Sequence, residues 1–128
     1  MNNMEKTLSK PKVVKATLDH TSWIRCYIYL WNGSVKLTEA EIDLLALFLS
    51  KYFDLKNTIT SDTELYEVLF STKKRREIKE KLNISEQVFN NRFTALKKKN
   101  IIKEVNQEYS LNPMIIPLKE VTFKFEVI

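Results

Sequence analysis

Apolar residues recur at helical spacing through the middle of the chain. The longest such run covers residues 37–55, where one apolar face is formed by Ile42, Leu45, Ala46, Leu49 and Phe53. Thr38 and Glu41 have the spacing of a capping box, so the helix is expected to begin just after Thr38. A second apolar stripe on the same helix consists of Leu44, Phe48 and Leu55. A helix that is apolar on two sides is either central to the fold or shared with a partner.

Further helices are expected downstream, each preceded by a capping residue. They cover residues 62–70, the segment from Ser71 or Thr72 to Leu82, and the segment from Ser85 to Asn100. Their inward-facing positions are Leu65, Val68, Leu69, Ile78, Leu82, Phe89, Phe93 and Leu96. Asn83 and Asn100 follow the last two helices, and Asn tolerates the left-handed backbone conformation better than other non-glycine residues. The last two helices are therefore expected to be joined by a tight turn.

After Asn100 the hydrophobic period changes from helical to alternating. Residues 101–105 and 108–111 predict a two-stranded hairpin that turns at Asn106 and Gln107. The tail of the chain also alternates, with one face formed by Val121, Phe123, Phe125 and Val127, and residues 13–18 form a candidate strand that would pair with it. The chain thus divides into a basic N-terminal arm with a candidate strand (1–19), a central domain (20–113) and a C-terminal strand arm (114–128).

The segment between the N-terminal arm and the long helix fits two structures. As a strand, residues 20–33 would place four aromatic side chains on one face, those of Trp23, Tyr27, Tyr29 and Trp31. As a helix, they would align Trp23, Tyr27 and Trp31 beside Ile24 and Ile28, with Gly33 as the stop. We favour the helix, followed by a short strand over residues 35–37.

Composition excludes several classes of protein. Hydrophobic residues make up 44% of the chain and charged residues 29%, values typical of one globular domain and not of a disordered or fibrous chain. No apolar run approaches the roughly 18 residues of a membrane span, and the N-terminus lacks the apolar segment of a signal peptide. A cytoplasmic protein without membrane contacts is therefore expected.

The sequence offers almost no catalytic chemistry. Cys26 is the only cysteine and His20 the only histidine, so neither an intrachain disulfide nor a Cys/His zinc site can form. There is no glycine-rich phosphate loop, and Glu39, Glu41 and Asp43 are explained as first-turn partners of a helix dipole. We expect no enzymatic activity, no cofactor, no metal and no small-molecule substrate.

The net charge of +5 is concentrated in two places. Residues 73–99 hold ten Lys or Arg against three Asp or Glu, and residues 1–18 hold four Lys against Glu5. A positive field concentrated in this way attracts polyanions. Lys73, Lys74, Arg75 and Arg76 stand at a helix N-terminus, where cations oppose the helix dipole, so an anionic partner explains them better than helix stability does.

The stretch from Arg76 to Ile102, REIKEKLNISEQVFNNRFTALKKKNII, resembles the helix-turn-helix of LuxR-type and MarR-type regulators. The positions that match are Ile78, Leu82, Ile84, Ser85, Phe89, Asn91, Phe93, Leu96, Lys99, Ile101 and Ile102. LTEAEIDLLALF resembles the helix before this motif, and YSLNP resembles the end of a wing. The resemblance covers about residues 35–113 and implies a mainly α fold with a small β part (α+β), a winged helix-turn-helix with terminal strand arms.

The resemblance also implies a function, binding of double-stranded DNA by a transcriptional regulator or replication accessory factor. The second helix of the motif would enter the major groove, and basic residues around it would meet phosphates. The residues placed for DNA contact are Lys73, Lys74, Arg75, Arg76, Ser85, Gln87, Asn90, Asn91, Arg92, Thr94, Lys97 and Lys98. Such a protein is expected to be a homo-oligomer, because a single recognition helix buries little surface against DNA.

A second function stays open beside DNA binding. The hairpin carries Glu104 and Glu108 and no arginine, which suits contact with DNA poorly. The chain would then be a structural subunit of a bacteriophage virion or a similar assembly, located in the host cytoplasm or the virion, and its core would bind other subunits. The partner interface expected for this function consists of Leu44, Phe48, Leu55, Trp23, Tyr27 and Trp31.

Overall fold

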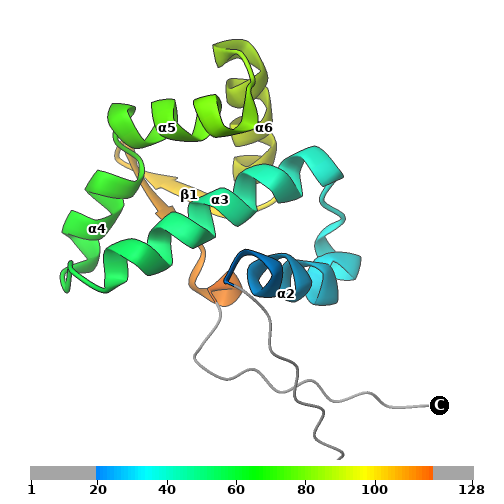
Figure 1. Cartoon of the computed structure of the whole chain (residues 1–128), viewed down its shortest axis with the longest axis horizontal. Helices are drawn as coiled ribbons and strands as arrows, with labels where there is room; N and C mark the ends of the chain where they lie inside the picture. Colours follow the sequence, from blue (N-terminus) through cyan, green and yellow to red (C-terminus); the bar gives the residue numbers. More distant parts are fainter. Residues whose placement is uncertain (1–19, 117–128) are drawn as a thin grey trace, which may run out of the picture.

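The computed structural model describes residues 20–116, which form a mainly helical α+β fold with one small antiparallel sheet (Figure 1). The elements in chain order are α2 (His20–Val35), α3 (Glu39–Lys56), α4 (Asp62–Leu69), α5 (Thr72–Leu82), α6 (Glu86–Lys98), β1 (Ile102–Val105), β2 (Glu108–Leu111) and a 3-10 turn, η1 (Pro113–Ile115). This confirms the α+β class. The predicted N-terminal arm and the C-terminal strand over residues 121–127 lie outside the described residues.

Helix α3 is the centre of the fold, and α2, α4, α5 and α6 all pack against it (Figure 1). Both of its apolar stripes are therefore covered by this chain. Leu44 and Phe48 are 0% exposed, and the Phe48 ring centre lies 5.1 Å from that of Phe70 and 6.1 Å from that of Phe93. Leu55 is partly buried against the same core. The prediction that Leu44 and Phe48 bind a partner is wrong, because the helices downstream in the same chain cover them.

Residues 20–33 are helical, as expected, but the end of α2 differs from the prediction. The helix continues past Gly33 to Val35 and ends at Lys36, which has a left-handed φ of 61°. The Asn32 side chain then brackets Leu37: its Oδ1 accepts the Leu37 N–H at 2.7 Å and its Nδ2 donates to the Leu37 carbonyl oxygen at 3.1 Å. The short strand predicted over residues 35–37 does not form, since this amide occupies backbone groups that a strand would pair.

The predicted helix boundaries are confirmed by their caps. Thr38 and Glu41 form a complete capping box at the start of α3. Ser71 caps α5 and Ser85 caps α6, each side-chain oxygen accepting a backbone N–H of the first turn. The stops after α5 and α6 are the two asparagines, with left-handed φ values of 53° at Asn83 and 62° at Asn100. α5 and α6 are consequently joined by a tight turn.

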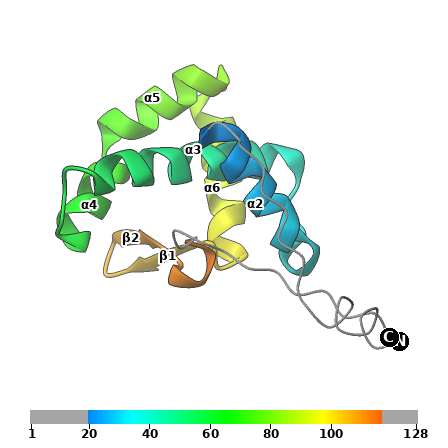
Figure 2. The ribbon, with the colours of Figure 1, turned by 60° about the horizontal axis from the view of Figure 1, so that its bottom comes forward.

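The hairpin forms at the predicted position. Ile102 pairs with Leu111 and Val105 with Glu108, and the two turn residues Asn106 and Gln107 both have positive φ, as a two-residue hairpin turn requires. β1 packs on α6, and β2 packs on α4, so the hairpin lies between these two helices (Figure 2). This arrangement gives the hairpin two edges with different neighbours.

Candidate nucleic-acid interface

The outer face of α6 carries a continuous polar stripe. Its inner face is anchored in the core by Phe89, Phe93 and Leu96. At 100° per residue, the side opposite these anchors holds the exposed residues Gln87, Asn91, Thr94 and Lys98, with exposed Asn90 beside them. Within residues 20–116 none of these five side chains has a hydrogen bond or an ion pair. Their donors and acceptors are therefore available to a ligand.

A shallow groove runs beside this stripe, between α6 and β1. Its volume is about 590 Å³, and it is lined by Thr94, Lys97, Lys98, Asn100, Ile102, Lys103, Glu104 and Val105. The single carboxylate in the groove, that of Glu104, lies 3.6 Å from Lys97 Nζ. The ammonium groups of Lys98 and Lys103 have no acidic partner in the described part of the chain. The groove is thus net basic.

The side chain of Arg75 is used for contacts within the protein. Its Nε donates to the carbonyl oxygen of Phe70 at the end of α4, at 2.9 Å. Its guanidinium carbon lies 5.3 Å from the ring centre of Phe93 and 5.2 Å from that of Tyr109. These contacts join α4, α5, α6 and the hairpin, so Arg75 stabilises the fold and is not a free cation for a ligand.

Of the other three cations in the basic cluster on α5, Lys74 is paired with a carboxylate, and Lys73 and Arg76 are not paired within the described part of the chain. Lys74 Nζ lies 3.4 Å from Glu77 Oε2, and that carboxylate accepts a second ammonium, from Lys51, at 3.0 Å. The Lys51 hydrogen bond is the main cause of the lowered pKa of Glu77. Lys73 and Arg76 are exposed and have no ion pair between residues 20 and 116. Of the four cations predicted to meet an anionic partner, these two remain available.

Lys79 on α5 and Lys99 at the end of α6 also form ion pairs within the chain. Lys79 Nζ lies 2.6 Å from Glu86 Oε2, and this hydrogen bond lowers the pKa of Glu86. Lys99 pairs with Glu41, which joins the end of α6 to the start of α3. Burial alone would raise the pKa of Glu41, but the bonds from Lys99 and Thr38 lower it. Both pairs serve the packing of the helices.

Ser85 and Arg92, also predicted for DNA contact, lie outside the polar stripe of α6. Ser85 is the N-cap of α6, and its Oγ accepts the Val88 N–H at 3.2 Å. Arg92 is half-buried on the flank of α6, away from the hairpin side where Lys97 lies. Neither belongs to the outer stripe. The residues predicted for DNA contact therefore divide into a stripe on α6, a separate exposed pair on α5, residues that stabilise the fold, and Arg92 on the flank of α6.

Sequence reasoning missed Asn100 and Lys103, which line the α6–β1 groove. Lys103 alternates with Ile102, so its exposure could be inferred from the strand pattern. Its closeness to α6 could not be inferred, because that depends on which edge of the hairpin packs against which helix.

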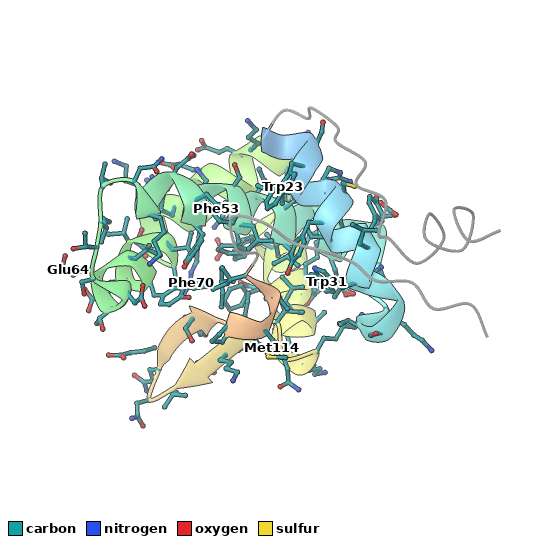
Figure 3. The ribbon with its side chains drawn as sticks, turned by 90° about the horizontal axis from the view of Figure 1, so that it is seen from below. Trp23, Trp31, Phe53, Glu64, Phe70 and Met114 are labelled. Atoms are coloured by element: carbon teal, nitrogen blue, oxygen red, sulfur yellow. The ribbon has the colours of Figure 1, made fainter. Side chains whose placement is uncertain are left out.

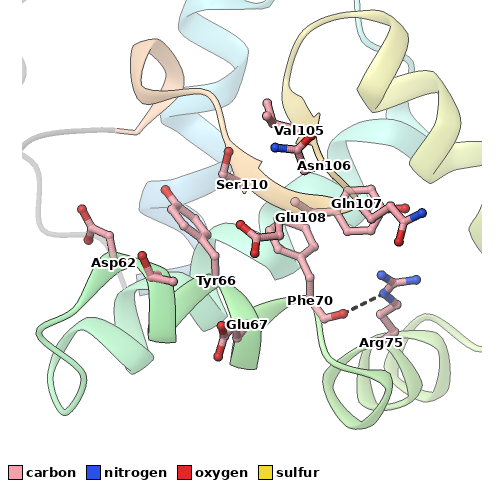
Figure 4. A pocket seen from close by; sticks show the side chains of 12 residues that line it. Asp62, Tyr66, Glu67, Phe70, Arg75, Val105, Asn106, Gln107, Glu108 and Ser110 are labelled. Atoms are coloured by element: carbon pink, nitrogen blue, oxygen red, sulfur yellow. Dashed lines mark hydrogen bonds between the residues drawn. The ribbon is translucent and has the colours of Figure 1, made fainter.

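The other edge of the hairpin has the opposite charge. A cleft of about 440 Å³ lies between α4, the start of α5 and the hairpin (Figure 4). Its acidic lining residues are Asp62, Glu67 and Glu108. Its only basic lining residue is Arg75, which is already bonded to the Phe70 carbonyl oxygen. The hairpin therefore separates a basic groove from an acidic cleft, and a polyanion is favoured only on the α6 side.

The aromatic residues predicted for a partner interface lie together on α2. Trp23, Tyr27 and Trp31 are partly buried, and the Tyr27 ring centre lies 5.9 Å from that of Trp23 and 6.0 Å from that of Trp31. Burial raises the pKa of Tyr27. Trp23 also meets Phe53 of α3 edge to face, and Figure 3 shows Trp23, Trp31 and Phe53 in one view. Much of this surface is used to pack α2 on α3.

The chain matches no family model, no curated protein and no solved structure. Within residues 20–116 there is no group of three or more His, Cys, Asp or Glu side chains that could hold a metal ion. None of the helices in the described part is long and apolar enough to cross a membrane. A functional assignment must therefore rest on the geometry and chemistry of this chain's own residues.

Proposed function

We propose that this chain is a non-enzymatic winged helix-turn-helix protein that binds double-stranded DNA. α5 and α6 form the helix-turn-helix, α6 lies in the major groove, and the hairpin is the wing. The observation that carries this proposal is the outer stripe of α6, where five exposed polar side chains have no partner among the described residues. By contrast, the half-buried residues Lys74, Arg75 and Lys97 of these two helices are paired within the chain.

The stripe has the chemistry needed to read base edges. Gln87 and Asn91 lie one helical turn apart, and each amide can form two hydrogen bonds with an adenine in the major groove. Thr94 follows at the next turn and suits a thymine methyl group or a hydrogen bond. Lys98 is at the end of the stripe, where it reaches a guanine or a phosphate. Direct readout is supported by the order of these four residues along one exposed face.

Phosphate contacts are supported on the β1 side of the hairpin. Lys98 and Lys103 line the α6–β1 groove with uncompensated charge, and Lys73 and Arg76 add two exposed cations on α5. The two hairpin carboxylates do not oppose this arrangement. Lys97 neutralises Glu104, and Glu108 lines the cleft at the other edge. The wing approaches DNA with its β1 edge, and the protein binds as a homo-oligomer because one reading helix buries little surface.

The test is the salt dependence of DNA binding, measured by fluorescence anisotropy with a labelled duplex. The affinity of the full chain should fall steeply between about 50 and 200 mM salt, because bound cations release counterions from DNA. K98Q and K103Q should each lower the slope of log K against log salt by about 1. The matched control is K56Q, since Lys56 pairs with Asp62 at the acidic side of the molecule and should leave the slope unchanged. Equal slopes in all four proteins, or no binding at low salt, would contradict the proposal.

One observation favours the second candidate, a structural subunit of a bacteriophage virion or similar assembly. Leu30 is 49% exposed, and helical spacing places it next to Trp23 and Tyr27 on α2. A large apolar side chain on a helix surface suits a protein contact. If assembly is the function, the chain sediments as a defined oligomer in high salt, and L30S dissociates it. A monomer in high salt that binds duplex tightly would exclude this candidate.

A further inference from the structure

The cleft at the β2 edge of the hairpin has the size and walls of a ligand site. Its volume of about 440 Å³ lies in the range of small-molecule and side-chain pockets, roughly 300 to 1,000 Å³. The walls are aromatic: Tyr66 and Phe70 come from the α4 side and Tyr109 from β2. The ring centres of Phe70 and Tyr109 are 5.7 Å apart, and those of Tyr66 and Phe70 are 6.3 Å apart. Phe70 is only 6% exposed and forms the floor of the cleft, while the half-buried rings of Tyr66 and Tyr109 form its sides.

One end of this cleft already holds a guanidinium from the chain itself. Arg75 lies over the Tyr109 ring and donates to the carbonyl oxygen of Phe70, a bond drawn in Figure 4. Lys97 also lies over Tyr109, with 5.6 Å between its Nζ and the ring centre. The aromatic wall thus attracts cations from two elements of the fold. This intramolecular pairing is independent of the acidic residues, and it points to the same class of ligand.

The carboxylates around the cleft extend this preference. Asp62 is used internally, because its Oδ1 lies 2.9 Å from Lys56 Nζ. Glu67 and Glu108 have no cationic partner in the described part of the chain. In Figure 4 the Glu108 side chain lies between those of Tyr66 and Phe70, whereas the Glu67 side chain points away from the hairpin, at the rim of the cleft. Burial raises the pKa of Tyr66 to about 12, so its hydroxyl stays neutral and can donate to an oxygen or accept from a guanidinium. Glu108 therefore offers a free carboxylate inside the cleft, and Glu67 adds negative charge at its rim.

We propose that this cleft binds an arginine side chain presented by a peptide segment of a partner protein. A guanidinium is planar, so it stacks on the accessible part of the Tyr66 ring while its N–H groups reach Glu108, and the charge of Glu67 adds to the attraction. An ammonium makes a weaker fit, because it cannot stack as a plane or form two parallel bonds with a carboxylate. The inference does not depend on DNA binding. If both sites are used, the two edges of the hairpin hold DNA and a protein partner at once.

The experiment is a titration of the 15N-labelled full chain with the blocked tripeptide Ac-Ala-Arg-Ala-NH2, followed by amide chemical shifts. Saturable shifts are expected for Tyr66, Phe70 and Ser110, which line the cleft. Ac-Ala-Lys-Ala-NH2 should bind several-fold more weakly, and Ac-Ala-Gln-Ala-NH2 should give no saturable shift. The double variant E67Q/E108Q should weaken arginine binding about tenfold or more, since it removes charge-assisted hydrogen bonds.

The matched control for that variant is E64Q/E80Q, which makes the same change in charge at two exposed glutamates outside the cleft. It should keep the affinity within about twofold, because screened surface charges contribute little. Equal weakening by both double variants would mean that net charge alone attracts the peptide, which overturns the site. Equal affinity for the arginine and lysine peptides would overturn the choice of arginine. Shifts confined to residues outside the cleft would overturn the location.

Discussion

Two neighbouring arginines show how much the surroundings of a residue decide its role. Arg75 and Arg76 are adjacent in a run of four basic residues, and no feature of the sequence separates them. In the structure Arg75 bonds to Phe70 and lies over two aromatic rings, whereas Arg76 is exposed without an ion pair among residues 20–116. The former serves the fold, and the latter is available to a ligand.

This difference gives a matched pair of substitutions. R75A should lower the free energy of unfolding by about 1 to 3 kcal/mol, because it removes a charged hydrogen bond and a cation–π contact. R76A should change it by less than about 0.5 kcal/mol. Urea denaturation followed by circular dichroism measures both. Equal stability of the two variants would contradict the role assigned to Arg75.

The same reasoning predicts the effect of a change in the outer stripe of α6. N91A should lower the affinity for a duplex selected from a random library by about 1 to 3 kcal/mol, with little change in binding to unselected DNA. The reason is that base contacts specify sequence, while phosphate contacts are sequence-independent. N57A is the control: it removes an exposed amide at the C-terminal end of α3, outside the stripe, and should bind like the wild type. Equal loss on selected and unselected DNA would argue against base readout by Asn91.

The residues of the candidate site could be predicted from the sequence only in part. The outer face of α6 follows from the spacing of Phe89, Phe93 and Leu96, because these anchors determine which positions face outward. The pair of Lys74 and Glu77 follows from their spacing of three residues on one helix. The pairing of Lys97 and Lys99 could not be predicted, because their partners, Glu104 and Glu41, come from other elements of the fold.

At the scale of elements, local signals were the most informative. Thr38, Ser71 and Ser85 act through hydrogen bonds to residues only a few positions away, so their roles can be read directly from the sequence. The same holds for the turn at Asn106 and Gln107. The end of α2 was not predictable in this way, since Lys36 is an unusual residue for a left-handed stop and the bracketing of Leu37 by Asn32 has no simple sequence signal.

The ion pair between Glu41 and Lys99 links two elements and predicts a pH dependence. In the folded protein the pKa of Glu41 is lowered below the unfolded value of about 4.3. The ionised carboxylate therefore contributes to the free energy of unfolding at pH values above about 4.3. The contribution is lost as the pH falls through the folded pKa. E41Q keeps the capping box but loses the ion pair, and at pH 7 it should lower the free energy of unfolding by about 1 to 2 kcal/mol.

Denaturation at a series of pH values measures this contribution. Below about pH 4 the difference between E41Q and wild type should shrink, because the wild-type carboxylate is then protonated. E64Q changes an exposed glutamate in the first turn of α4 and should follow the wild-type curve. A constant difference between E41Q and wild type from pH 7 to pH 3 would contradict the role of the ion pair.

At the scale of the whole molecule, α3 holds the fold together. The second apolar stripe on this helix fitted two arrangements, a central helix and a shared interface, because a stripe alone does not identify what covers it. The structure decides for the central position, since α4, α5 and α6 all pack on α3. The α+β class could be predicted because it follows from local periods. The packing of the hairpin between α6 and α4 depends on contacts between distant segments.

A core substitution tests this central position. L44A should lower the free energy of unfolding by about 2 to 5 kcal/mol, because Leu44 is fully buried and its truncation leaves a cavity. L47A makes the same change at a partly buried position on α3 and should cost clearly less. The loss in L44A should not depend on protein concentration, since the contacts are within one chain. A concentration-dependent loss would mean that Leu44 is at an interface between chains.

The central claim, that the outer face of α6 and the β1 edge of the hairpin bind DNA, can be tested most directly by mapping. The 15N-labelled full chain is titrated with a short duplex, and the amide and side-chain shifts are followed residue by residue. The largest changes should fall on Gln87, Asn91, Thr94, Lys98 and Lys103, with smaller ones at Lys73 and Arg76. Changes confined to the acidic cleft or to α2, or no saturable change at low salt, would contradict the claim.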